Sequence, residues 1–288
     1  MHRSDWLVLS FLAGAPANTL AQARPTAQDV VDRIRQNIGV RWSDTTVDTF
    51  KDGDPATSVT GIAVTMMATF DVLQRAAAAG ANLVITHEPT FYDHFDRLDV
   101  LEGEHDAVTA AKRAFIREHR LVVVRMHDHW HRRRPDGIMT GMTRALEWER
   151  YRDPQNEYRF TLPEMSLGTL ATSIRQRLHA PTLRVVGDAN QRVTRVALVP
   201  GAAGFSLQRQ ALQPPDVDVL VIGEAREWET VEYAADAIAA GQKKALIIIG
   251  HIPSEQAGME EFARWLRTIV KDVPITFVAT ADPFWAPK

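Results

Sequence analysis

The chain has 288 residues, of which 45% are hydrophobic and 24% charged, as in an ordinary globular protein with one large domain or two intertwined ones. Its net charge of −3 gives no electrostatic reason to expect nucleic acid as a partner. Cysteine is absent, which excludes disulfides, thiolate metal ligands and cysteine nucleophiles. Any metal must be bound through nitrogen and oxygen, which suits zinc, manganese or iron.

The amino terminus resembles a secretory leader. Residues 6–13 are apolar, and Ala-Gln-Ala at 21–23 is the pattern that signal peptidase reads. The apolar run is too short, and too interrupted by Gly14 and Pro16, to be a permanent membrane span. We expect residues 1–23 to be a signal peptide, with an exported or periplasmic location if it is cleaved and a cytoplasmic one otherwise. The alternative is a misassigned start codon.

From residue 24 onward, hydrophobic spacing predicts alternating helices and strands. In the first half we expect helices at 27–38, 71–79, 107–118 and 138–148, and strands at 59–66, 81–87 and 121–126. Residues 152–163 are polar, and we interpret them as an irregular boundary between two halves.

In the second half, Ser166 is a predicted N-cap. We expect helices at 166–178, 205–212, 228–240 and 260–270, and strands at 183–186, 193–199, 217–222, 245–249 and 275–278. Repeated βα units of this kind predict an α/β protein with mixed or parallel sheets and helices on both faces. We expect two related, interlinked lobes, at about 24–151 and 164–288, within one domain of residues 24–288.

Three histidine clusters follow predicted strands. They are Thr-His-Glu-Pro at 86–89, His-Asp-His-Trp-His at 127–131 and Gly-His-Ile-Pro-Ser-Glu at 250–255. In open α/β sheets, ligands gather at the carboxyl ends of strands. Imidazoles and carboxylates delivered there from three strands predict a metal site in the cleft between the lobes.

An internal repeat supports a shared cleft. Residues 71–89 and 230–253 each contain a helix, a glycine, an apolar strand and a histidine followed two residues later by proline. Related lobes that face each other would bring His87 and His251 together. Helix, glycine and strand in this order are common, so coincidence is the alternative.

The clusters differ in what they predict individually. If the second strand continues, His127, His129 and His131 share one face, with Asp128 on the other. His251 and Glu255 are four residues apart, so they meet on one face of a helix.

The remaining histidines of polar or helical segments are expected at the surface: His94, His105, His119 and His179. The basic run at 132–134 is either a solvated turn or a contact for an anionic substrate.

Taken together, these motifs resemble the Nif-three-like dinuclear metal-centre family, which includes GTP cyclohydrolase type 2 homologues. The resemblance runs from about residue 27 to 284 and is carried by the segments 80–87 (GANLVITH), 184–187 (RVVG), 196–201 (VALVPG), 221–224 (VIGE), 250–255 (GHIPSE) and 282–284 (DPF). It implies two divalent metal ions and a homo-oligomer, in this family a ring-like hexamer.

The family's ligand positions fall on four imidazoles and two carboxylates: His87, Glu88, His127, His131, His251 and Glu255. Glu88 stands where the family has a second His, and His131 where it has Asp, so the total number of each ligand type is kept. Asp128 or His129 would substitute if the loop is shifted in register. A His that the family has near Trp228 is missing.

The function implied is that of a metal-dependent hydrolase acting on a small phosphorylated or cyclic-amide substrate. Glu224, or Glu88 if it is not a ligand, is the candidate general base. The alternative is a non-catalytic protein that binds or delivers metal, or a ring-shaped scaffold. The chain lacks a lysine-bearing glycine loop for a triphosphate, so we expect weak or no GTP cyclohydrolase activity.

Overall fold

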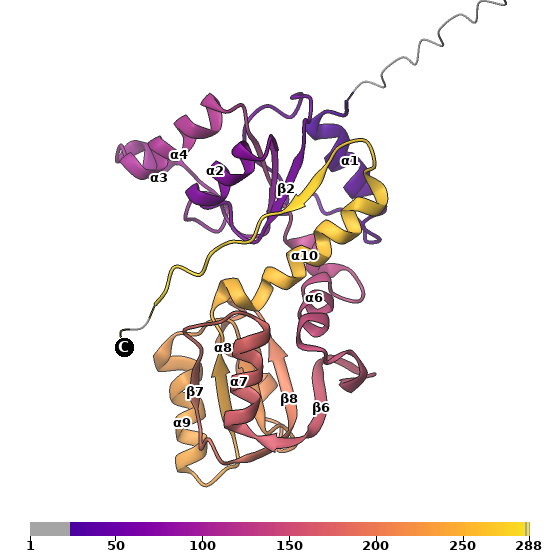
Figure 1. Cartoon of the computed structure of the whole chain (residues 1–288). Coiled ribbons are helices and arrows are strands. Elements are labelled where there is room, and N and C mark those ends of the chain that lie inside the picture. The colour runs from indigo at the N-terminus through magenta and orange to yellow at the C-terminus, as the bar shows by residue number, and fades with distance from the viewer. Residues whose placement is uncertain (1–23, 286, 288) are drawn as a thin grey trace, which may run out of the picture.

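The computed structural model describes residues 24–285 and 287, which form two α/β lobes connected through a long helix, α10 (Figure 1). The predicted signal peptide at 1–23 lies outside the described residues. Within the described part of the chain, no helix has both the length and the hydrophobicity to span a bilayer.

The first lobe contains a five-stranded sheet in the order β1-β4-β3-β2-β11. The strands are β1 (Phe50–Asp52), β4 (Val122–Arg125), β3 (Leu83–Thr86), β2 (Ile62–Thr65) and β11 (Ile275–Phe277). All neighbours are parallel except β1 and β4. Every residue of β2, β3 and β4 is buried, because helices cover both faces of the sheet.

The helices of this lobe are α1 (Ala27–Asn37), α2 (Phe70–Ala78), α3 (Asp99–Gly103), α4 (Ala107–Glu118), α5 (Asp128–Arg132) and α6 (Gly137–Leu146), with a short 3-10 helix at Glu149–Tyr151. Side chains cap several of them: Thr26 caps α1, Thr69 caps α2 and Asp136 caps α6 by accepting backbone N–H groups.

The second lobe contains a six-stranded sheet in the order β5-β6-β8-β9-β10-β7. The strands are β5 (Arg152–Asp153), β6 (Asn156–Ser166), β8 (Arg192–Val199), β9 (Val219–Ile222), β10 (Ala245–Ile248) and β7 (Arg184–Val186). The helices are α7 (Leu167–Arg177), α8 (Gly204–Leu212) and α9 (Glu232–Ala239), the last preceded by a π-helical turn at Glu227–Val231. The predicted α/β class, with mixed sheets in two interlinked lobes, is confirmed.

The irregular conformation predicted for residues 152–163 is wrong. Residues 152–163 are not irregular but form β5 and most of β6. The reason is an alternation within a polar stretch: Phe160 and Leu162 are buried, while Thr161 between them is exposed. This period of two is the signature of a strand with one buried face.

Helix α10 (His251–Ile269) begins nine residues before the predicted start at 260. Pro253 is tolerated because the first turn of a helix needs no backbone donor at that position. The helix starts at the end of β10 in the second lobe, packs along α6 and β2, and leads into β11 (Figure 1). Strand β11 therefore lies in the sheet of the first lobe, although residues 164–288 were expected to form the second lobe and residues 24–151 the first.

Candidate metal centre

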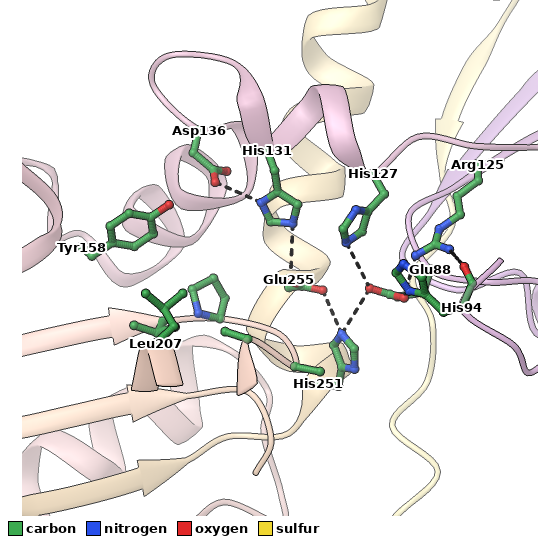
Figure 2. A pocket seen from close by; sticks show the side chains of 14 residues that line it. Glu88, His94, Arg125, His127, His131, Asp136, Tyr158, Leu207, His251 and Glu255 are labelled. Atoms are coloured by element: carbon green, nitrogen blue, oxygen red, sulfur yellow. Dashed lines mark hydrogen bonds and ion pairs between the residues drawn. The ribbon is translucent and has the colours of Figure 1, made fainter. Parts of the chain in front are cut away.

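The structure brings the six predicted ligands close together, and five of them line one cavity of about 300 Å³ (Figure 2), while the sixth, His87, is fully buried and is not part of that lining. Each comes from the carboxyl end of a parallel strand: His87 and Glu88 follow β3, His127 and His131 belong to the turn and helix α5 after β4, and His251 and Glu255 lie in the first two turns of α10 after β10. The local sequence places them there because each apolar strand ends just before its histidine.

Three imidazoles face one another. The rings of His87, His127 and His131 have centroids 4.6 to 5.0 Å apart, and one nitrogen of each lies within 4.8 Å of the others. Three ring nitrogens this close together could hold one cation as its ligands.

The two carboxylates lie between these imidazoles and His251. Glu255 has Oε2 3.1 Å from His251 Nε2 and Oε1 3.8 Å from His131 Nε2. Glu88 Oε1 is 3.3 Å from His251 Nε2 and 3.8 Å from His127 Nε2. Oε1 of Glu255 therefore lies near His131, whereas Oε2 lies near His251 and, at 3.7 Å, near Nε2 of His87. In this arrangement a single carboxylate can serve two neighbouring cations.

His87 provides a direct test of whether a cation fits. Its side chain is fully buried, Nδ1 is 3.1 Å from the carbonyl of Met126, and Nε2 has no hydrogen-bond partner. Burial lowers the pKa of His87 well below its usual value, so the ring is neutral and donates from Nδ1. A lone pair on Nε2, buried and unsatisfied, is what a metal ion would bind.

The charges around His251 also favour a bound cation. Burial alone would lower its pKa, but hydrogen bonds to Glu224, Glu255 and Glu88 raise the pKa of His251 to about 12. Burial would likewise raise the pKa of Glu88, but the neighbouring histidines, His251 first, hold it well below its usual range. Negative charge is therefore concentrated here, and the proton on His251 compensates part of it.

The ligand rings are fixed by a second set of partners. Asp136 lies 3.0 Å from Nδ1 of His131, and Asp128 lies 3.0 Å from Nδ1 of His127. In both cases Nε2 is left to face the cluster. Partners of this kind orient metal-binding histidines and raise their basicity.

His129 does not share a face with His127 and His131, contrary to the expectation from a continuing strand. The chain becomes helical at Asp128, so residues four apart align and His129 turns away from the cavity. Its ring is buried, stacks on Trp42 at 3.8 Å, and its Nδ1 lies 2.6 Å from Asp48. With Asp128 orienting His127, neither alternative ligand lies in the cluster.

Asp48 was not predicted as part of the site. Its buried carboxylate accepts the backbone N–H groups of three successive residues, His127, Asp128 and His129, and thereby fixes the start of α5. Nothing in the local sequence distinguishes it from a surface aspartate, because its partners lie about 80 residues further along the chain.

The two candidate bases differ in their surroundings. Glu88 Oε2 lies 3.2 Å from the guanidinium of Arg125, a buried side chain that also donates to the carbonyls of His87 and His94. Glu224 is half exposed, lies 3.6 Å from Nδ1 of His251 and does not line the cavity. It is therefore outside the six-residue cluster and contacts it through His251.

The remaining histidines, His94, His105, His119 and His179, are exposed as expected. His94 also lines the mouth of the cavity. The basic run at 132–134 does not line it: Arg134 donates to the preceding carbonyls, and Arg133 packs over Trp130.

Comparison with known sequences matches the chain both to a protein family and to individual curated proteins. The profile of the family described as Duf34/NIF3 (NGG1p interacting factor 3) matches residues 37–283. A protein named GTP cyclohydrolase 1 type 2 homolog, from Staphylococcus aureus strain MRSA252, is 32% identical over 69 residues, which are 24% of this chain and 18% of that protein. The match thus spans less than a fifth of this curated relative.

Solved structures share the fold over nearly the whole chain. A crystal structure of a hypothetical protein from Staphylococcus aureus has a TM-score of 0.70 and 18% identity, covering 92% of this chain and 100% of that one. A Bacillus cereus protein related to NIF3 has a TM-score of 0.72 and 15% identity, again covering 92% and 100%. At these identities the likeness concerns the fold alone.

Proposed function

This chain belongs to the DUF34/NIF3 family, and from that premise we propose that it is a dinuclear metal-binding protein that acts as a metal-dependent hydrolase. The observation that carries the proposal is the orphaned Nε2 of His87, which is buried among three further imidazoles and two carboxylates. A nitrogen in that position loses its hydration without gaining a partner, unless a cation is bound.

The ligands would be the four histidines and two glutamates already described. Glu255 would contact both ions, because its Oε1 lies near His131 and its Oε2 near His251 and His87. Nitrogen and oxygen donors in this number suit zinc, manganese or iron. When bound, such ions supply Lewis acidity and acidify water.

The protein's own residues complete the site. Glu224 is the better candidate for a general base, because Glu88 is held by Arg125 whereas Glu224 is half exposed and lies beside His251. In the metal-free chain His251 lowers the pKa of Glu224, and a half-exposed carboxylate without that neighbour is also ionised at neutral pH, so Glu224 can accept a proton.

The proposed substrate is a small phosphorylated or cyclic-amide compound. A cavity of about 300 Å³ accommodates a compact group. We expect weak or no activity on GTP, because the one arginine lining this cavity, Arg125, already donates to Glu88 and to two carbonyls, and residues 132–134 are not part of the lining.

A second candidate function is metal storage or delivery, or a ring-shaped scaffold, without catalysis. The observation that favours delivery is the partial exposure of His127 and His131, 24% and 28% of their side chains, which would let an ion leave.

The experiment is metal analysis of the full chain, followed by a screen of phosphate esters and cyclic amides with and without added manganese or zinc. We expect metal-dependent turnover that His251→Ala and Glu255→Ala abolish together with metal binding. The matched control is Glu260→Ala, an exposed carboxylate on the same helix. Failure to take up metal would refute the proposal, and metal uptake without turnover would support a carrier.

Two further expectations stay predictions. Assembly into a hexamer rests on the family resemblance, and light scattering at micromolar concentration tests it.

Export requires removal of residues 1–23, so mass spectrometry of the protein from its native host should find Arg24 at the amino terminus. An intact Met1 would instead favour the cytoplasm.

A further inference from the structure

A second cavity continues the metal-site cavity away from the ligands. It also has a volume of about 300 Å³, and both cavities are lined by Tyr158, Val199 and Leu207. From there it extends over Ala197 and Ala211. We call this second cavity the side groove. Figure 2 shows Tyr158 and Leu207 on the side of the metal-site cavity opposite Glu88, where the side groove begins.

The side groove owes its apolar character to the periodicities of the elements around it. Ala197 and Val199 are two apart on β8 and therefore point to the same face of the sheet. Leu207 and Ala211 are four apart on α8 and lie on one face of that helix. Leu207 keeps 47% of its surface exposed, so part of this side chain is accessible to a group that enters the groove.

The arginine side chains that line the two cavities already pair with other groups of the protein, so they are not free to bind a phosphate chain. In the side groove the charged lining residue is Arg159, which is bound to Asp216 at 3.3 Å. In the metal-site cavity the lining arginine is Arg125, which is bound to Glu88 and to backbone carbonyls. Among the described residues lining the two cavities, no arginine or lysine is left for a second anionic group.

We propose that the side groove is the subsite for an uncharged aryl or acyl group of the substrate, whose reacting polar group lies at the metal centre. This inference rests on the proposed function and narrows it to amphiphilic substrates, such as esters, amides or phosphates of an apolar group. Leu207 and Ala211 determine specificity, and Tyr158 is the positioning residue where the two cavities meet. Together the cavities reach the size of small-molecule sites, roughly 300–1,000 Å³.

Hydroxamates test this directly, because the same metal-chelating group can carry a small or a large substituent. The full metal-loaded chain is titrated with acetohydroxamate and with benzohydroxamate by calorimetry. We expect benzohydroxamate to bind at least about tenfold more tightly, since its ring would be removed from water in the side groove.

Two variants test whether the difference in affinity between the two hydroxamates arises in the side groove. Leu207→Asp places a charge at the opening, and Ala211→Trp fills the groove. Both should reduce the ratio of the two affinities to within about threefold, while bound metal per chain stays at the wild-type value. The control is Val108→Asp, on an exposed position of α4 in the other lobe, which should leave the ratio unchanged.

The outcomes separate the two proposals. Equal affinities of the two hydroxamates in the wild type, or a ratio that neither groove variant changes, would overturn the side groove as a subsite while leaving the metal centre intact. A chain that takes up no metal and binds neither hydroxamate would overturn the proposed function, and with it this inference.

Discussion

Glu255 lies directly against the backbone of Gly201, so closely that a Cβ atom on Gly201 would overlap Oε1 of the carboxylate. Gly201 belongs to the turn between β8 and α8, and its N–H donates to Ser254 Oγ at 2.9 Å. The turn and the first part of α10 therefore hold Glu255 from two sides. The orientation of this carboxylate depends on a residue that has no side chain.

Gly201→Ala should displace Glu255 and weaken metal binding. Both Gly201 and Gly204 have positive φ angles, so alanine at either position costs about 1 kcal/mol of folding free energy. Gly204 has no atom near the position of a Cβ, which makes Gly204→Ala the matched control. We expect metal loss in Gly201→Ala alone, measured by elemental analysis. Equal metal content in the two variants would contradict the role of the close contact.

Asp48→Ala should destabilise the protein and loosen the second histidine cluster. It removes a buried acceptor of three backbone N–H groups and of the His129 ring, which should cost about 2–4 kcal/mol in the free energy of unfolding. Urea unfolding measures this cost. The control is Asp44→Ala, an exposed aspartate of the same segment, for which we expect no change beyond about 0.5 kcal/mol. Similar values for both variants would refute a structural role for Asp48.

Asp136→Asn should weaken metal binding with little effect on stability. One oxygen of Asp136 caps α6, and an asparagine oxygen can still do so, whereas the other orients His131 through Nδ1. Loss of such an outer partner lowers metal affinity about 10- to 100-fold. Competition with a chromophoric chelator gives the affinity, and thermal unfolding without metal checks the helix cap. An unchanged affinity would show that His131 does not depend on Asp136 for its orientation.

Metal binding should release a proton from His251. The pKa of His251 is raised to about 12 in the metal-free protein, so the ring is protonated at neutral pH, while a metal ligand must be neutral. The cation therefore competes with a proton, and its affinity should rise with pH by up to about tenfold per unit. Calorimetry in two buffers with different ionisation enthalpies should give different heats. The same heat in both buffers would mean that no proton is released.

The apolar strands predicted where the three histidine clusters would lie, because strand ends converge in a parallel sheet, and the resemblance to the Nif-three-like family identified the six candidate ligands within them. The sequence could not predict Asp48, Asp136 or Arg125 as their partners. Arg125 stands inside a hydrophobic strand, and its role depends on carbonyls of the segment 87–94 brought beside it by the fold. Such contacts are set by tertiary packing, and neither spacing nor composition records them.

The two errors in the fold have different causes. Strand β6 alternates buried and exposed residues within a polar composition, so average polarity obscured its periodicity. The position of His129 depended on where β4 ends, and a helix begins there instead of a longer strand. Local periodicity identifies what an element is more reliably than where it stops.

The pairing of β11 with β2 has a consequence for the order in which the protein can fold. The hydroxyls of Thr65 and Thr280 form a hydrogen bond across 215 residues of chain. During synthesis, β2 emerges early and has one edge uncovered until the last strand arrives, since β11 follows α10. Contacts between such distant segments are slow to form, and an open strand edge invites pairing with other chains. We therefore expect nascent chains to depend on protection of this edge until translation is nearly complete.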